Sequence, residues 1–533
     1  MQRRDMLTLA TASGVLGVSS LKEAVAQSRA ATLLVLVESG PNSLDLHAPG
    51  ANRPTQALVW ATYDRLMGFG NTTAPQGHQI YDYDNLTPEA AESWAVAADG
   101  MSVVFTLRQG MTFHSGNPVT AADVKWSLDR AVTQPGFPKN QMNSGSLLEP
   151  RQFEVLDDRR IKVTYLNPDK LLMPNLSNAI PNIFDSRLVR ERATAADPWG
   201  VEFTRANHAG GGAFKVAAWR PGQETILERF RDWKGGPQTS VQRIIIREVP
   251  SAATRRALIE RGDADVLADL PPKDFSELIQ ARRATVLSTP MKNAWRFLGM
   301  NTQRAPFNDK RVRQAVAWAV PYEEIFSAAL FGRGRKLWGA TSQAEDLRWP
   351  TPSPYRTDLD RAKALLAEAG HPNGFETTFH MDLSQATLHE PIALLLQEGL
   401  ARVGIRVTIE RVPAGQLRGQ LANKQLPFFV EDFGAWFDDP DYFFFLAYHG
   451  NNGPWNSANY VNPALTTLID AARVERHGVA YEAQVRQMFA IAFEDVPFIP
   501  LVQPFQDVAV KNGVTGHRYV FHRLLEYRFF QKP

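Results

Sequence analysis

The chain has 533 residues, 44% of them hydrophobic, which is enough to bury the cores of about three domain-sized units. Its 58 Lys and Arg residues nearly balance its 56 Asp and Glu residues, and a formal net charge of +2 creates no field that would attract a nucleic acid. The sequence contains no cysteine, which excludes disulfides, thiolate nucleophiles and cysteine-ligated zinc.

The N-terminal residues predict an export signal. Arg3 and Arg4 precede a weakly apolar stretch at 6–21, and the segment 24–26 (Ala-Val-Ala) fits a small-x-small cleavage site. The paired arginines resemble a twin-arginine signal, and the general secretory route is the alternative. No later stretch reaches the roughly 18 to 20 apolar residues that span a bilayer. We therefore expect cleavage near Ala26 and a mature protein that is soluble in the periplasm.

The first part of the mature chain predicts strands and one well-capped helix. Residues 32–38 form a continuous apolar run, typical of a strand buried on both faces, and a turn cluster follows at 39–43. Val103, Phe105 and Leu107 alternate with Val104, Thr106 and Arg108, which predicts another strand. Residues 120–123 (Thr-x-x-Asp) have the spacing of a capping box at the start of a helix.

Farther along the chain, short strands alternate with helices. This alternation indicates an α/β architecture with partly parallel sheets. Strands are expected at 214–216, 225–227, 244–246 and 405–409. Helices are expected at 253–261, 308–320, 358–369 and 391–402.

Several short motifs follow one another along nearly the whole mature chain. They are P-N-S-L-D at 41–45, Y-D-R-L at 63–66, A-E-S-W at 91–94, F-T-L-R at 105–108, G-G-G-A-F at 210–214, L-G-M-N at 298–301, A-K-A-L-L-A-E-A-G at 362–370 and D-V-P-F-I-P at 495–500. Each motif alone is weak. The ordered set resembles the family 5 bacterial extracellular solute-binding proteins, the dipeptide, oligopeptide and nickel binders of ABC importers. One departure from the family pattern, a shortened segment before 439–440 (Asp-Pro), leaves the class of ligand open.

The resemblance implies a periplasmic-binding-protein-like α/β fold with two lobes. It would be of the large type II with an extra inserted domain, and its ligand cleft would lie between the lobes. Lobe I would combine residues 28–66, 193–290 and 501–533. The inserted domain would cover 67–192, and lobe II would cover 291–500.

The resemblance also implies a function. The protein would be a monomer that captures a small peptide-like ligand and delivers it to a membrane ABC permease with ATPase subunits, without chemistry, cofactor, metal or nucleic acid. A sugar or opine conjugate or a metal chelate is the alternative cargo. A secreted hydrolase or a periplasmic chaperone is the alternative from another class, although the sequence lacks G-x-S-x-G, H-E-x-x-H and P-loop motifs.

The segment 433–441 is the strongest local candidate for ligand binding. A zwitterionic solute needs a carboxylate for its ammonium group and aromatic walls for its side chains. By motif match, the resemblance assigns the ammonium contact to Asp439, with Asp438 second, and Trp436 and Trp455 would be pocket walls. The alternatives are a solvated turn or helix cap for the aspartates and core packing for the tryptophans. An acidic calcium loop is a further alternative, but its ligand spacing is not met.

Other polar side chains are expected to reach the ligand. Asn456 and Tyr460 follow in the same part of the chain. Asn42 and Ser43 follow the first strand, where ligands of open α/β sheets bind, and a plain connecting turn is the alternative. Asn301 is expected at the hinge or in the cleft wall. A basic partner for a ligand carboxylate is also expected, but the sequence offers 58 basic residues and singles out none of them.

Overall fold

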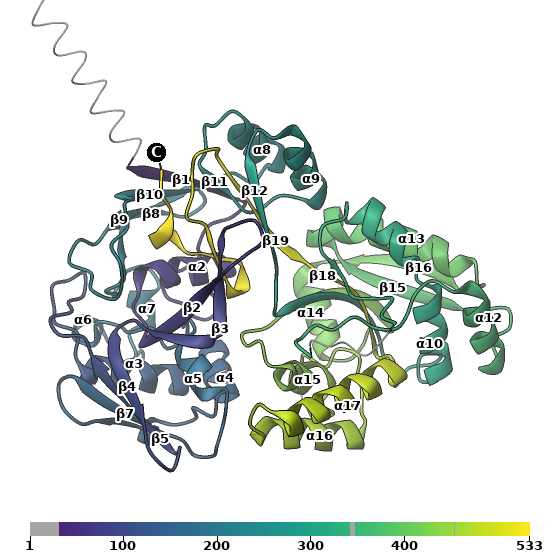
Figure 1. Cartoon of the computed structure of the whole chain (residues 1–533), viewed down its shortest axis with the longest axis horizontal. Coiled ribbons are helices and arrows are strands. Elements are labelled where there is room, and N and C mark those ends of the chain that lie inside the picture. Colours follow the sequence, from purple (N-terminus) through teal and green to yellow (C-terminus); the bar gives the residue numbers. More distant parts are fainter. Residues whose placement is uncertain (1–30, 342–346, 452, 533) are drawn as a thin grey trace, which may run out of the picture.

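The structure is a computed structural model that describes residues 31–341, 347–451 and 453–532. The expected export signal therefore lies outside the described residues. Four sheets are distributed between two lobes (Figure 1). The first lobe comprises residues 31–290 and 505–532, and the second lobe comprises residues 294–503.

The central sheet of the first lobe has seven strands in the order β12-β19-β11-β1-β10-β9-β8. Their bounds are β1 (Thr32–Val37), β8 (Phe214–Arg220), β9 (Glu224–Arg229), β10 (Arg243–Glu248), β11 (Val266–Leu267), β12 (Thr285–Pro290) and β19 (Phe505–Val510). β1 pairs in parallel with β10 and β11, and the other pairs are antiparallel. The two faces of β1 pack into different apolar clusters, Val35 into one and Leu36 into the other. This confirms the expected strand with two buried faces.

Two four-stranded sheets complete the first lobe, in the orders β2-β3-β20-β21 and β4-β5-β7-β6. Their bounds are β2 (Met67–Thr73), β3 (Gln79–Pro88), β4 (Ala91–Val96), β5 (Ser102–Leu107), β6 (Phe153–Val155), β7 (Arg160–Thr164), β20 (Arg518–Val520) and β21 (Leu524–Leu525). The expected alternating strand is β5. Strand β20, near the end of the chain, pairs with β3, so the last residues return to this lobe.

The second lobe is built on a six-stranded mixed sheet in the order β14-β18-β13-β17-β15-β16. Its strands are β13 (Ala294–Met300), β14 (Arg335–Lys336), β15 (Glu376–Asp382), β16 (Arg406–Val412), β17 (Phe428–Gly434) and β18 (Phe498–Gln503). β15 pairs in parallel with both β16 and β17, while β13 is antiparallel to β17 and β18. Every residue of β13 is buried, because both faces of this central strand are covered.

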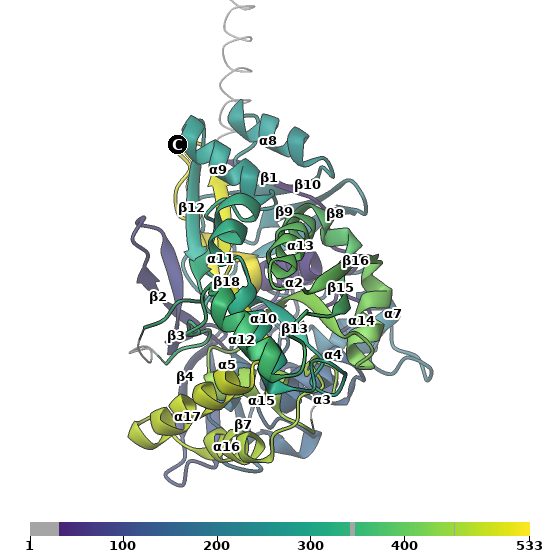
Figure 2. The same cartoon turned by 90° about the vertical axis from the view of Figure 1, so that its right-hand side faces the viewer.

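Helices cover the sheets of both lobes. In the first lobe they are α2 (Arg53–Thr62), α3 (Ala121–Thr133), α4 (Phe137–Ser144), α5 (Leu172–Leu176), α6 (Ser186–Arg190), α7 (Val201–Thr204), α8 (Ala252–Glu260) and α9 (Pro272–Ala281). In the second lobe they are α10 (Lys310–Ala319), α11 (Tyr322–Glu324), α12 (Leu359–Glu368), α13 (Ala386–Ala401), α14 (Ala414–Ala422), α15 (Pro440–Tyr448), α16 (Pro463–Val474) and α17 (Val479–Asp495). Figures 1 and 2 show α15, α16 and α17 beside α4 and α5, so helices of the two lobes face each other here.

The start of α3 agrees with the sequence prediction, and the start of α13 differs from it. The capping box is present at the start of α3, where the Thr120 and Asp123 side chains bond reciprocally to the backbone. α13 was expected to begin at Pro391, but it begins at Ala386 and contains Pro391. Leu388 packs against the second-lobe core and His389 is buried, so the turn before Pro391 also gains from burial.

The chain crosses between the lobes at two neighbouring points (Figure 1). One crossing is the segment 291–293 between β12 and β13, and the other is Pro504 between β18 and β19. The Met291 N–H donates to the Pro504 carbonyl at 3.0 Å, and Gln503 Nε2 donates to the Met291 carbonyl at 2.9 Å. β18 stays in the second-lobe sheet through Gln503, slightly past the expected boundary at residue 500. The division of the first lobe into lobe I and an inserted domain stays a prediction.

Candidate functional site

A cavity of about 370 Å³ is lined by both lobes. Tyr83 and Asp84 of β3 form the first-lobe side. The second-lobe side consists of Leu347, Arg348, Asp438, Asp439, Pro440, His477, Gly478, Tyr481 and Glu482. A larger hollow of about 860 Å³ beside Trp318 is lined by the second lobe alone. We take the cavity between the lobes as the candidate site, because it combines contributions from both lobes with buried carboxylates.

Two consecutive aspartates of the second lobe meet two alternate tyrosines of the first. The Tyr81 hydroxyl donates to Asp438 Oδ1 at 2.6 Å, and the Tyr83 hydroxyl donates to Asp439 Oδ2 at 2.6 Å. Both tyrosines lie on β3, where the two-residue period of a strand puts their side chains on one face. The aspartates lie in the turn between β17 and α15, next to Pro440 in the first turn of that helix. These hydrogen bonds join the lobes directly.

Asp438 is a buried carboxylate with an unused acceptor. The residue is 8% exposed, and its Oδ2 has no hydrogen-bond partner. Burial raises the pKa of Asp438 to about 6, although the Tyr81 hydrogen bond and the positive charge of Lys292 act to lower it. A carboxylate in this environment gains from a cation placed within reach of its free oxygen.

Asp439 is held on both sides. Its Oδ2 accepts from Tyr83, and its Oδ1 lies 2.6 Å from His477 Nε2. The hydrogen bond to Asp439 raises the pKa of His477 above its ordinary value, because the carboxylate favours the charged imidazolium. Asp439 therefore already has a protein cation as a partner.

Arg348 adds a positive charge to the same cavity. One of its guanidinium nitrogens lies 3.1 Å from Asp84 Oδ2, across the boundary between the lobes. Both side chains are more than half exposed, which leaves the guanidinium accessible from the cavity. A planar guanidinium is suited to bind a carboxylate through paired hydrogen bonds. The cavity thus offers groups for both ends of a zwitterion.

The described residues give no sign of a metal site or a membrane span. Within residues 31–341, 347–451 and 453–532, no three His, Asp or Glu side chains are grouped so that they could hold a metal ion. None of the helices in these ranges combines the length and the apolar character needed to cross a membrane.

Comparison with known proteins identifies the family. Residues 85–455 match the model of the "Bacterial extracellular solute-binding proteins, family 5 Middle", which is more than half of the chain. The chain belongs to this family. The expected resemblance is therefore confirmed.

Curated relatives align with the solute-binding protein over most of its length. It is 25% identical to the probable D,D-dipeptide-binding periplasmic protein DdpA of Escherichia coli K12, covering 89% of this chain and 88% of that one. It is 26% identical to heme-binding protein A of Haemophilus influenzae, with coverages of 92% and 95%. It is also 26% identical to the glutathione-binding protein GsiB of Pectobacterium atrosepticum, with coverages of 85% and 88%.

Solved structures confirm the expected two-lobed fold. The periplasmic binding protein DppA from Helicobacter pylori, in complex with the peptide STSA, matches with a TM-score of 0.77 at 22% identity. That alignment covers 94% of the solute-binding protein and 98% of DppA. A dipeptide-binding protein from Pseudoalteromonas sp. SM9913, in complex with Met-Leu, also gives 0.77, at 21% identity and with coverages of 94% and 100%.

The two tryptophans expected as pocket walls lie outside the lining of the 370 Å³ cavity. Trp436 of the solute-binding protein is buried between the lobes, with its ring centroid 4.4 Å from that of His522 and 5.7 Å from that of Phe137. Trp455 is 48% exposed and packs on Phe433 at 5.4 Å. Their contact with a ligand stays a prediction.

Three of the expected polar contacts are used within the second lobe. Asn456 donates to the Tyr460 carbonyl at 2.7 Å and accepts from the Tyr460 N–H at 2.9 Å, so it closes a loop. The Tyr460 hydroxyl donates to Asp495 at 2.6 Å. Asn301 donates to the Lys424 carbonyl at 2.8 Å and is fully buried. The structure does not bring these side chains to the cavity.

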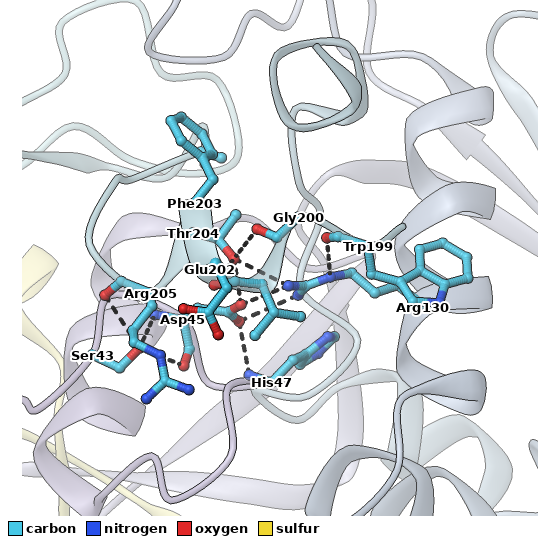
Figure 3. Close-up of polar contacts among 12 residues, drawn as sticks. Ser43, Asp45, His47, Arg130, Trp199, Gly200, Glu202, Phe203, Thr204 and Arg205 are labelled. Carbon is cyan, nitrogen blue, oxygen red and sulfur yellow. Dashed lines mark hydrogen bonds and ion pairs between the residues drawn. The ribbon is translucent and has the colours of Figure 1, made fainter. Parts of the chain in front are cut away.

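The loop after β1 is held by a buried ion pair (Figure 3). Arg130 lies 2.6 Å from Asp45 Oδ2, and the Thr204 hydroxyl donates to the same oxygen at 2.6 Å. Burial acts to raise the pKa of Asp45, but the charge and hydrogen bond of Arg130, together with His47 and Thr204, outweigh it and lower that pKa to about 2. Ser43 donates to the Asp45 carbonyl at 3.1 Å, and Asn42 donates to the Gly50 carbonyl at 2.9 Å. Ser43 and Asn42 therefore shape this loop and do not line the cavity.

Sequence reasoning missed the partners of the aspartates. Tyr81 and Tyr83 were not selected, although aromatic residues at alternate positions of a strand were visible as a signal. His477 and Arg348 lie in connecting segments without a distinguishing pattern, and only the fold brings them to the cavity.

Proposed function

We propose that this solute-binding protein captures a peptide or peptide-like solute between its lobes in the periplasm. It then delivers the solute to a membrane ABC permease that is driven by separate ATPase subunits. One observation carries the proposal: the buried, unpartnered Oδ2 of Asp438 and the guanidinium of Arg348 belong to the same cavity between the lobes. The names of the dipeptide- and glutathione-binding relatives support the same class of ligand.

In the proposed complex, the ammonium group of the solute binds at Asp438 and Asp439, and its carboxylate binds Arg348. Because the cavity is lined by both lobes, the solute makes its full set of contacts only when the lobes are closed. Binding therefore shifts the population toward the closed form, which the permease would recognise.

We further propose that the protein holds its solute without transforming it. Among the residues that the structure describes, the cavity lining includes His477 as a base but no serine or threonine that could act as its nucleophile. The twin-arginine-like signal, cleavage near Ala26 and a monomeric state belong to the same proposal.

The test is to identify the cargo directly. We would purify the exported protein, release its bound solute by denaturation and identify that solute by mass spectrometry, then measure its affinity by calorimetry. A peptide or a close amino-acid conjugate supports the proposal. A sugar conjugate or a metal chelate would keep the transport role but change the cargo. Turnover of the solute, or binding of unfolded chains without any small solute, would overturn the proposal.

A further inference from the structure

Asp438 and Asp439 are neighbours in sequence but differ in what they can accept. Asp438 keeps one free oxygen, whereas both oxygens of Asp439 are bonded to Tyr83 and His477. The proposed function brings a ligand ammonium to this pair of aspartates, and this further inference rests on it. A ligand cation must then share Asp439 with His477 or displace it.

The position of His477 allows displacement. Its side chain is 54% exposed, and it lies in the short connection between α16 and α17. The flanking residues Val474 and Val479 are 63% and 88% exposed. Gly478 has a φ of 155° and has open space where a side chain would begin. The imidazole can therefore leave Asp439 without disturbing a packed core.

We propose that His477 is a built-in competitor for the ligand's ammonium group, so that an amine-bearing solute displaces the imidazolium from Asp439 and His477 gives up its proton. The competitor makes the site selective, because a solute without an ammonium group cannot displace a charged hydrogen bond. It also couples binding to the pH around the protein.

The surrounding charges are consistent with this exchange. The second lobe places Asp441, Tyr481 and Glu482 near the imidazole, together with Glu475, Arg476 and Arg348, and the first lobe adds Lys170, Tyr83 and Asp84. Asp439 is the strongest influence, and its hydrogen bond raises the pKa of His477. Once displaced, the imidazole returns toward its ordinary pKa of about 6.5 and loses its proton at neutral pH.

The experiment counts protons by calorimetry at pH 7.0 in buffers of different ionisation enthalpy. The probe is the tightest-binding member of a panel of free-amine dipeptides that includes Met-Leu. The wild-type protein should release a fraction of one proton, up to about one per dipeptide. The His477→Gln variant should release fewer protons per dipeptide, because the contribution of His477 is missing. It should also bind the dipeptide about tenfold more tightly, because an uncharged amide competes more weakly for Asp439.

Two arms keep the result interpretable. Asp438 can also release a proton when a cation arrives, because its pKa is raised to about 6, but this contribution persists in His477→Gln and cancels in the difference. N-acetylated dipeptides, tested on the wild-type protein, should bind weakly and release no proton from His477.

The outcomes separate this inference from the proposed function. Dipeptide binding with equal proton release in the wild type and His477→Gln would overturn the inference and leave the function standing. Loss of dipeptide binding in a folded His477→Gln variant would make His477 a direct ligand contact, and this too would overturn it. Absence of any dipeptide binding in both proteins would overturn the inference together with the proposed peptide cargo.

Discussion

Lys170 of the first lobe and Asp441 of the second form an ion pair, with 3.0 Å between Nζ and Oδ1. The preceding residue, Asp169, pairs with Arg473 at 3.1 Å. Asp169 and Lys170 of the first lobe thus each pair with an opposite charge of the second lobe. We call the four residues Asp169, Lys170, Asp441 and Arg473 the interlobe clasp. Lys170 also donates to the Ala472 carbonyl at 2.6 Å, which ties the same lysine to the end of α16. The clasp fixes how the lobes meet beside the cavity.

Lys170→Met should shift the protein toward an open form. The substitution leaves the fully buried Asp441 with the Tyr481 hydroxyl, which donates at 2.6 Å, and without its direct ion-pair partner. Loss of one partner of such a pair costs about 2 to 5 kcal/mol, so the closed form and solute affinity should both weaken. Small-angle scattering of the solute-free protein would report a larger radius of gyration.

The matched control for the clasp is the double variant Lys170→Met with Asp441→Asn. It removes both charges, so most of the loss should be recovered. Equal scattering curves for the wild type and Lys170→Met would show that the clasp does not set the closed form.

Asp439→Ala should abolish measurable binding of a free-amine dipeptide. The substitution removes one of the two carboxylates at the ligand ammonium and leaves only Asp438, at a cost of about 2 to 5 kcal/mol in binding. Tyr83→Phe is the matched control, because it removes one uncharged hydrogen bond to the same carboxylate and should cost about 1 kcal/mol. Unchanged calorimetric affinity in Asp439→Ala would remove Asp439 from the site.

Arg348 should recognise the carboxylate end of the solute. Arg348→Gln should weaken binding of a dipeptide with a free C-terminus by about 1 kcal/mol, because water screens the half-exposed guanidinium. It should have little effect on the corresponding dipeptide amide, which lacks the negative charge. Comparing both ligands by calorimetry separates a carboxylate contact from a general effect on closure, since a closure defect would weaken the two equally.

Asp64→Asn should stabilise the protein at alkaline pH. Asp64 is 2% exposed, accepts from Trp233 Nε1 at 2.7 Å, and has its pKa raised by burial to about 7. Below the unfolded-state pKa of about 4 both states hold the proton, and as pH rises toward 7 the folded state alone keeps it, so folding becomes progressively less favourable. The variant should therefore match the wild type near pH 4 and gain on the order of 4 kcal/mol at pH 8.

Urea unfolding of the wild type and Asp64→Asn across this pH range measures the difference. A constant difference in unfolding free energy at all pH values would show that Asp64 is ionised in the folded protein.

The fold could be predicted from local sequence patterns and from the ordered set of motifs. The apolar run at 32–38 contains β1, and Thr120 and Asp123 form the capping box of α3. Both features could be predicted because they are determined by residues close together in the sequence. The family resemblance supplied the two lobes, which no periodicity reveals. α13 begins at Ala386, before the expected start at 391, because Leu388 packs against the second-lobe core and His389 is buried ahead of the proline.

The site was predicted less completely, since its parts meet only in three dimensions. Asp438 and Asp439 were selected and do line the cavity. Asn456 and Asn42 close loops outside the lining of the cavity, and their contact with a ligand stays a prediction. The partners that decide the electrostatics, Tyr83 and His477, come from segments far from the aspartates.

The two chain crossings have a mechanical consequence. Met291 and Pro504 are hydrogen-bonded to each other, so the lobes are joined by a pair of coupled strands and not by two independent tethers. Sliding or twisting one lobe past the other would break this hydrogen bond, whereas rotation of the lobes about a line through Met291 and Pro504 preserves it. We therefore expect closure of the lobes to be a hinge rotation about this line.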